Sequence, residues 1–165
     1  MVNDGKIVRI AVDTMGGDYA PEEIIKGAVM AAERGDVEII LVGPMEILEK
    51  ELAKYDSSYL PISYARADEV IKEGESPAFA IRRKPNASVA VATELVKTGG
   101  ADAIISAGPT GAASVSAIRY LGMISGVERP ALCVPLVGLA PKTVLVDGGA
   151  NINCKPHHLL SFAAI

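Results

Sequence analysis

Residues 103–113, AIISAGPTGAA, have the composition of a loop that binds an anion. The apolar run that ends at Ile105 is typical of a buried parallel strand, Gly108 begins a turn, and Thr110 opens a helix of small residues. The first turn of a helix presents free N–H groups and the positive end of its dipole, and Gly111 would let a phosphate approach the backbone. The alternative is a tight turn that only brings helix and sheet into contact. The residues alone leave both interpretations open.

An acidic residue followed by paired glycines ends a predicted strand at two other points, Asp13 and Asp147. Ligands of open parallel sheets bind at the carboxyl ends of the strands, so these loops and the loop at Gly108 are predicted to line one cleft. The candidate lining residues are Asp13, Gly16, Gly17, Gly108, Gly111 and Asp147. In the alternative interpretation the first loop is an ordinary connection, with Asp18 near the start of the next helix.

The chain has one run of consecutive cations, Arg82, Arg83 and Lys84. A short charged run usually marks a solvated helix end, which is the simpler interpretation. The functional interpretation is a clamp for an anion.

Cys154, His157 and His158 raise the question of a metal site or a nucleophile. Adjacent histidines on a helix are predicted to point to different faces, and this ligand set is small for a metal centre. We therefore predict no metal here.

Composition narrows the classes of function. The 165 residues carry 16 basic and 20 acidic side chains, a formal net charge of −4, which argues against a nucleic acid partner. Aromatic residues make up only 4%, too few for base-stacking platforms. The sequence has two cysteines and shows no charged stretch followed by an apolar leader, which favours a cytoplasmic location. No apolar run reaches the roughly 20 residues that a membrane-spanning helix needs.

Alternating strands and helices must position these loops. Besides the strand before Gly108, the predicted strands span residues 6–14, 37–43, 60–67 (at an edge), 130–137 and 143–147. The predicted helices span residues 21–34, 44–55, 87–98, 110–123 and 156–165. Residues 68–86 interrupt the alternation with charges and a Ser-Pro pair. The pattern predicts an α/β fold with a mainly parallel sheet and helices on both faces.

Four motifs occur in order along the chain, VDTMGGDYAP, SPAFAIRRK, SAGPTGA and DGGANINCKPHHL. Together they resemble the PlsX family of bacterial phosphate acyltransferases. The sequence departs from the family pattern at Pro109, where an asparagine is usual, at Gly148, where a valine is usual, and at His157, where a glutamate is usual. The first departure takes a polar side chain out of the candidate anion loop.

The resemblance implies a three-layer α/β/α sandwich similar to the phosphate acetyltransferases and isocitrate dehydrogenases. The implied reaction transfers a fatty acyl group from acyl carrier protein to inorganic phosphate, without a cofactor, and forms acyl phosphate for phospholipid synthesis. A cytoplasmic homodimer with peripheral membrane association is implied for the full-length family.

The resemblance also assigns roles within the site. Catalytic roles fall on Thr110, Asn151 and Lys155, with the Gly108 and Gly111 backbone as donors to the reacting oxygens and Lys155 as the nearby cation. Asp13, Gly16, Gly17 and Asp147 line the phosphate or substrate site. Arg82, Arg83 and Lys84 would contact phosphate or the acidic surface of the carrier protein.

Other classes of function stay open. An inert module that binds phosphate or a nucleotide would show binding without turnover, and a scaffold for lipid-synthesis partners would show neither. A Rossmann dehydrogenase is disfavoured because no GxGxxG follows the first strand. We expect residues 1–165 to be a single α/β domain, the amino-terminal half of a longer family chain. We also expect this chain alone not to form acyl phosphate at an appreciable rate.

Overall fold

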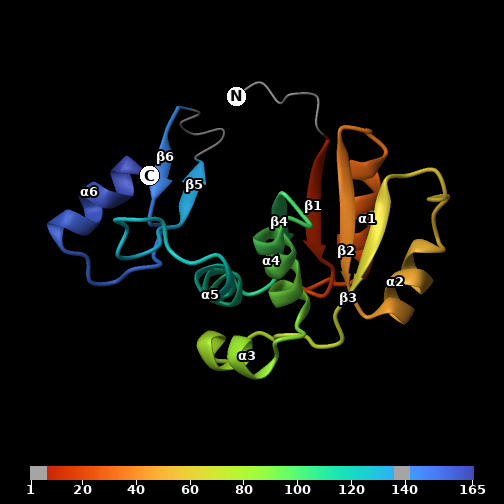
Figure 1. Cartoon of the computed structure of the whole chain (residues 1–165), viewed down its shortest axis with the longest axis horizontal. Helices are drawn as coiled ribbons and strands as arrows, with labels where there is room; N and C mark the ends of the chain where they lie inside the picture. Colours follow the sequence, from red (N-terminus) through yellow and green to blue (C-terminus); the bar gives the residue numbers. More distant parts are fainter. Residues whose placement is uncertain (1–6, 136–141) are drawn as a thin grey trace. The chain divides into compact units, whose positions relative to one another are not determined.

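The computed structural model describes residues 7–135 and 142–165 (Figure 1). The chain divides into two compact units, residues 1–121 and residues 122–165. Each unit has its own sheet, with four strands in the first unit and two in the second. Lys6 and residues 136–137, which the sequence assigned to strands, lie outside the described residues.

The sheet of the first unit is parallel throughout, with the strand order β3-β2-β1-β4. Its strands are β1 (Val8–Asp13), β2 (Val37–Gly43), β3 (Ile62–Arg66) and β4 (Ala103–Ser106). The predicted limits of the second strand and the edge position of the third are both confirmed. The register places Asp13, the last residue of β1, directly beside Ser106, the last residue of β4. The two loops that follow these strands therefore begin at the same edge of the sheet.

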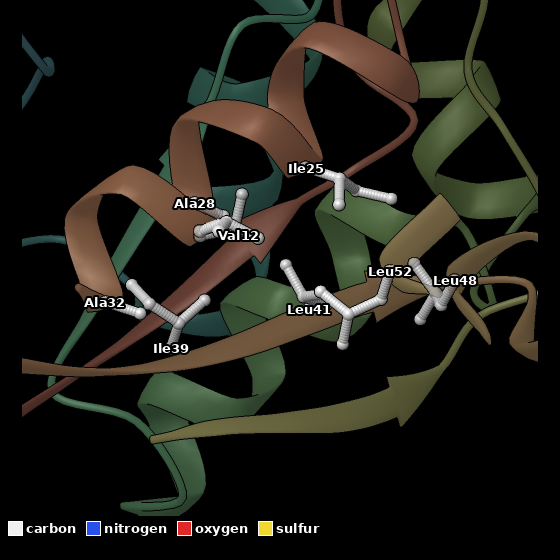
Figure 2. Close-up of a cluster of buried hydrophobic side chains, with 9 residues drawn as sticks. Val12, Ile25, Ala28, Ala32, Ile39, Leu41, Leu48 and Leu52 are labelled. Carbon is white, nitrogen blue, oxygen red and sulfur yellow. The ribbon is translucent and has the colours of Figure 1, made fainter. Parts of the chain in front are cut away.

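Two helices cover one face of this sheet, α1 (Glu22–Ala32) and α2 (Met45–Leu52). Alternate residues of β1 and β2 point to this face, and Figure 2 shows Val12, Ile39 and Leu41 packed beneath the helices. The buried cluster consists of Val12, Ile25, Ala28, Val29, Ala32, Ile39, Leu41, Leu48 and Leu52. Each large side chain buried in this way contributes about 1.5–3 kcal/mol, so this cluster is a main source of stability for the first unit.

Helix α4 (Ser88–Thr98) covers the opposite face, where Ala92 packs near Ala11 and Val42. Two further helices, α3 (Pro77–Arg83) and α5 (Thr110–Tyr120), pack beside it. A buried hydrogen bond connects α5 to α4, in which Ser116 Oγ donates to Thr93 Oγ1 at 2.9 Å. The predicted three-layer α/β/α arrangement is confirmed for the first unit.

Strand β4 differs from the sequence expectation of a buried parallel strand. It pairs with β1 on one side, and within the described residues no strand pairs with its other side. Ile105 is consequently 55% exposed. Helix α5 is also only partly covered, with Ala112 and Ser116 as its buried residues. An apolar run of this length does not distinguish an edge strand from a central one.

The second unit consists of a short antiparallel ribbon and one helix. The ribbon pairs β5 (Cys133–Pro135) with β6 (Val144–Val146), and α6 (Pro156–Ala164) follows. His158 and Phe162 are the buried residues of α6. Among the described residues, no helix in either unit is both long and apolar enough to span a membrane.

Candidate functional site

A chain of hydrogen bonds joins the two loops at the carboxyl edge of the sheet. The Gly108 N–H donates to Ser106 Oγ at 3.1 Å, and the Ser106 hydroxyl donates to Asp13 Oδ2 at 2.6 Å. Asp13 itself is only 3% exposed. The distance from the Ser106 hydroxyl to Asp13 Oδ2 lies at the short end of the range for hydrogen bonds between two oxygens. The arrangement fixes the Asp13 side chain below the backbone of the second loop.

Glycines allow the two loops to touch. A Cβ on Gly16 would lie 2.5 Å from Asp13 Oδ2 and 2.8 Å from the Gly108 nitrogen. Gly17 adopts φ +120, a conformation that side chains disfavour. Gly111 serves a related purpose, because a Cβ there would lie 2.7 Å from Pro77 Cγ on α3. Close packing therefore accounts for these glycines, whether or not an anion also approaches them.

The amino terminus of α5 retains free donors. The amides of Ala112 and Ala113 both donate to the Pro109 carbonyl, at 2.9 and 3.2 Å, and the Gly108 amide is held by Ser106. Within the described part of the chain, the Thr110 and Gly111 amides have no hydrogen-bond partner. The first turn contains no acidic residue. Thr110 and Gly111 are thus the amides that can bind an anion here.

A cleft of about 390 Å³ opens beside this helix terminus. Its walls come from the loop after β1, from residues 70–73 and from residues 107–109. Lys72 is the cation among the described lining residues, whereas Asp18 and Glu73 bring negative charge to the same cleft. Pro109, which directly precedes α5, lines the cleft, so the helix terminus with its positive dipole end lies next to the cleft only through this residue.

The predicted basic cluster is divided between two environments. Lys84 Nζ lies 2.7 Å from both Glu75 carboxylate oxygens and 2.9 Å from the Val70 carbonyl. The hydrogen bond from Lys84 holds the pKa of Glu75 below its usual value, and a second hydrogen bond from the Lys72 amide acts in the same direction. Lys84 thus ties α3 to the segment that forms one wall of the cleft. The positive charge of Lys84 is neutralised by Glu75.

Arg82 and Arg83 are both exposed on α3. The Arg83 guanidinium lies over the Phe79 ring, 4.7 Å from its centroid, and Phe79 is 58% exposed. This contact orients one guanidinium above an apolar surface that solvent can reach. The pair is available to an acidic partner in a way that Lys84 is not.

The remaining predicted site residues lie in the second unit. Asp147 has φ 60, and its Oδ1 accepts a hydrogen bond of 3.2 Å from Asn151 Nδ2, which also donates to the Pro130 carbonyl at 2.8 Å. Lys155 is exposed and immediately precedes α6. Because these residues belong to the second unit, their convergence with Asp13 and Gly108 in one cleft stays a prediction.

The two histidines correct one expectation. His157 Nε2 and His158 Nε2 lie 3.3 and 3.1 Å from the same Glu128 Oε2, so they do not point to different faces. A carboxylate on the preceding loop draws the two rings together, which sequence spacing cannot show. His158 Nδ1 accepts the Lys155 amide proton at 3.1 Å, which places the His158 proton on Nε2, toward Glu128. Hydrogen bonds from His158 first, and then His157, lower the pKa of Glu128.

Comparison with known proteins bears on what this arrangement does. The model of the family described as fatty acid synthesis protein matches residues 8–165. The chain belongs to this family. Three similar proteins are each named phosphate acyltransferase. The one from Desulforudis audaxviator is 51% identical over 155 residues, covering 94% of this chain and 45% of the relative.

The other two similar proteins come from Pelotomaculum thermopropionicum and Syntrophomonas wolfei. Each is 49% identical over 96% of this chain, and the match covers 46% and 50% of the relative, respectively. The chain therefore spans about half the length of the curated relatives it matches. The resemblance to phosphate acyltransferases drawn from the four motifs is confirmed.

Sequence reasoning missed two polar residues near the carboxyl edge of the sheet, Ser106 and Lys72. Ser106 stands at the end of β4, opposite Asp13, and a polar residue at a strand end within SAGPTGA was the signal that could have revealed it. Lys72 lies in an irregular charged segment whose path the sequence pattern does not predict. Parallel pairing places Ser106 beside Asp13, and hydrogen bonds from the Lys72 amide and from Lys84 to Glu75 hold the segment that contains Lys72 at the cleft.

Proposed function

We propose that this chain provides the phosphate-binding part of an acyltransferase that moves a fatty acyl group from acyl carrier protein to inorganic phosphate. The free amides of Thr110 and Gly111 at the start of α5 carry this proposal, because Pro109 directly before them lines the cleft that contains Lys72. Membership of the fatty acid synthesis protein family and the similarity to proteins named phosphate acyltransferase support it. The product is acyl phosphate for phospholipid synthesis.

The proposed chemistry depends on position and charge more than on a strong base. An oxygen of hydrogen phosphate attacks the carbonyl carbon of the thioester, the carbon–sulfur bond breaks, and the phosphate proton ends on the departing thiolate. The Thr110 and Gly111 amides, with the Thr110 hydroxyl, donate to the phosphate or to the oxyanion that forms at the carbonyl. Asn151, Asp147 and Lys155 of the second unit complete the site in this proposal.

For the whole protein we extend the proposal to a cytoplasmic homodimer with peripheral association to the membrane. The resemblance of the four sequence motifs supports this extension. In the proposed phosphate site, Lys72 is the first cation and Lys155 is the second.

Acyl phosphate formation tests the proposal directly. The purified chain is incubated with an acyl carrier protein thioester and labelled phosphate, alone and with the remaining half of a similar phosphate acyltransferase added in trans. Label that moves from phosphate into an acylated product measures acyl phosphate. Saturable phosphate binding together with labelled acyl phosphate supports the proposal. Binding without turnover in either mixture would indicate an inert phosphate module, and the absence of both would indicate a scaffold.

Replacing Lys72 by alanine is expected to weaken phosphate binding. One cation within a few ångströms of an anion at a solvated site is worth about 1 kcal/mol, which corresponds to a loss of about threefold to tenfold in affinity. Titration calorimetry with inorganic phosphate measures the change. The matched control is Lys26→Ala on α1, whose ammonium lies 3.3 Å from Glu23 on the other face of the sheet. If the two variants bind phosphate with equal affinity, Lys72 does not take part in phosphate binding.

The exposed arginines of α3 are expected to bind the acidic surface of the carrier protein. The double variant Arg82→Ala/Arg83→Ala should lower carrier affinity by about tenfold at low salt and flatten its salt dependence, because exposed charges are screened beyond about 10 Å at 0.1 M salt. Lys84 is left out because Glu75 already neutralises it.

The control for this surface removes two cations from the opposite face, with Lys26→Ala/Lys50→Ala. Fluorescence anisotropy of a labelled acyl carrier protein compares the variants over a salt series. If the arginine variant binds the carrier with the same affinity and salt dependence as the control, Arg82 and Arg83 do not contact the carrier protein. They are then only the solvated end of a helix.

A further inference from the structure

The two oxygens of the Asp13 carboxylate differ in their hydrogen bonding. Oδ2 accepts the Ser106 hydroxyl at 2.6 Å, but Oδ1 is fully buried and accepts no hydrogen bond from any residue that the structure describes. The Ser106 oxygen itself accepts the Gly108 amide, which leaves its proton for Asp13. The Ser106 hydroxyl thus occupies Oδ2, and Oδ1 is the oxygen left for a donor from a ligand. A buried acceptor without a donor is costly, so this geometry favours a ligand that brings one.

A small cavity has Asp13 among its lining residues. Asp13, Ser106 and the buried Ser88 line it, and its volume of about 10 Å³ suits one water-sized group. It shares Met15 and Pro109 with the larger cleft, together with the wall segment Val70–Ile71. A ligand in the cleft can place one hydroxyl in the cavity while its remaining atoms stay beside the amino terminus of α5.

A buried acceptor at an anion site discriminates between tetrahedral anions. Hydrogen phosphate carries a proton on one oxygen and can donate it in a hydrogen bond, whereas sulfate at neutral pH has acceptors only. Sulfate would set an oxygen lone pair against the Asp13 carboxylate and leave its oxygen unpaired. Sites built around such a hydrogen bond reject the analogue that lacks the donor much more strongly than sites that recognise shape.

We propose that Asp13 makes this site selective for hydrogen phosphate over fully deprotonated oxyanions, with the phosphate hydroxyl in the small cavity donating to Asp13 Oδ1. Ser106 and the Gly108 amide hold the carboxylate in position for that contact. The inference rests on the proposed phosphate site and adds the residue that determines its anion specificity.

Binding of three anions to the 165-residue chain tests this assignment. Titrations at about pH 8 compare inorganic phosphate, arsenate and sulfate, because all three then carry about two negative charges but only the first two retain a proton. We expect phosphate and arsenate to bind at least about tenfold more tightly than sulfate. This comparison uses the unaltered chain, so it holds even if a variant does not fold.

The Asp13→Asn variant adds a signature that a merely structural role would not give. The asparagine oxygen can still accept the Ser106 hydroxyl, while its amide presents a donor to the cavity. Phosphate should bind more weakly and sulfate more tightly, so that their affinities come within about threefold of each other. Asp36→Asn, an exposed aspartate paired with Arg34 before β2, is the matched control and should keep the selectivity of the unaltered chain.

The outcomes separate this inference from the function on which it rests. Equal binding of phosphate and sulfate by the unaltered chain would overturn the role of Asp13 and leave the phosphate site standing. Parallel loss of both anions in Asp13→Asn would make Asp13 structural only. If neither anion binds the unaltered chain, the proposed phosphate site fails and this inference falls with it.

Discussion

Gly16→Ala should lower the free energy of unfolding by about 1–3 kcal/mol and abolish measurable phosphate binding. The added methyl would lie 2.5 Å from Asp13 Oδ2 and 2.8 Å from the Gly108 nitrogen. Neither neighbour can turn aside, because one is a buried carboxylate held by Ser106 and the other is backbone. The two loops must separate, and the hydrogen-bond chain between them breaks.

A second glycine in the same unit provides the control. Gly27 lies within α1, and a Cβ there would meet nothing within 4 Å. Gly27→Ala should therefore stabilise the chain by about 0.5–1 kcal/mol, as alanine is the better helix former. Urea unfolding and phosphate titration on both variants measure the contrast. A Gly16→Ala variant as stable as the unaltered chain would show that the loops do not meet at this glycine.

Leu41→Ala should cost about 2–5 kcal/mol, the largest stability effect expected here. Leu41 is 0% exposed in the middle of β2 and packs with Ile25 and Leu48 beneath α1 and α2 (Figure 2). Its truncation leaves a cavity that the strand cannot close without losing its pairing to β1 and β3.

Met30→Ala is the matched control for this core position. Met30 lies on α1 but is 61% exposed, so its truncation should change stability by no more than about 0.5 kcal/mol. The measurement is the denaturant midpoint at an unchanged slope, because a constant slope shows that the same surface is exposed on unfolding. A cost below about 1 kcal/mol for Leu41→Ala would contradict the placement of β2 in the centre of the core.

Local sequence signals were sufficient for most of the element order. The apolar run of β2 predicted its limits, and Gly99 ends α4 in the left-handed conformation that glycine favours. Helix α3 was missed as an element because its seven residues lie within a charged segment and are too few for a periodic pattern. Its position comes from packing on α5 and from the Lys84–Glu75 ion pair.

The amino-acid sequence by itself determined the α/β class, the two loops that follow β1 and β4, and the family, because short-range periodicity and motif order are properties of the chain alone. The tertiary structure decided which of those residues act together. Parallel pairing of β1 with β4 sets Asp13 beside Ser106, and the bond from Lys84 to Glu75 takes that cation out of the basic cluster. Contacts such as Asp13–Ser106 join residues 93 positions apart, and no local pattern encodes them.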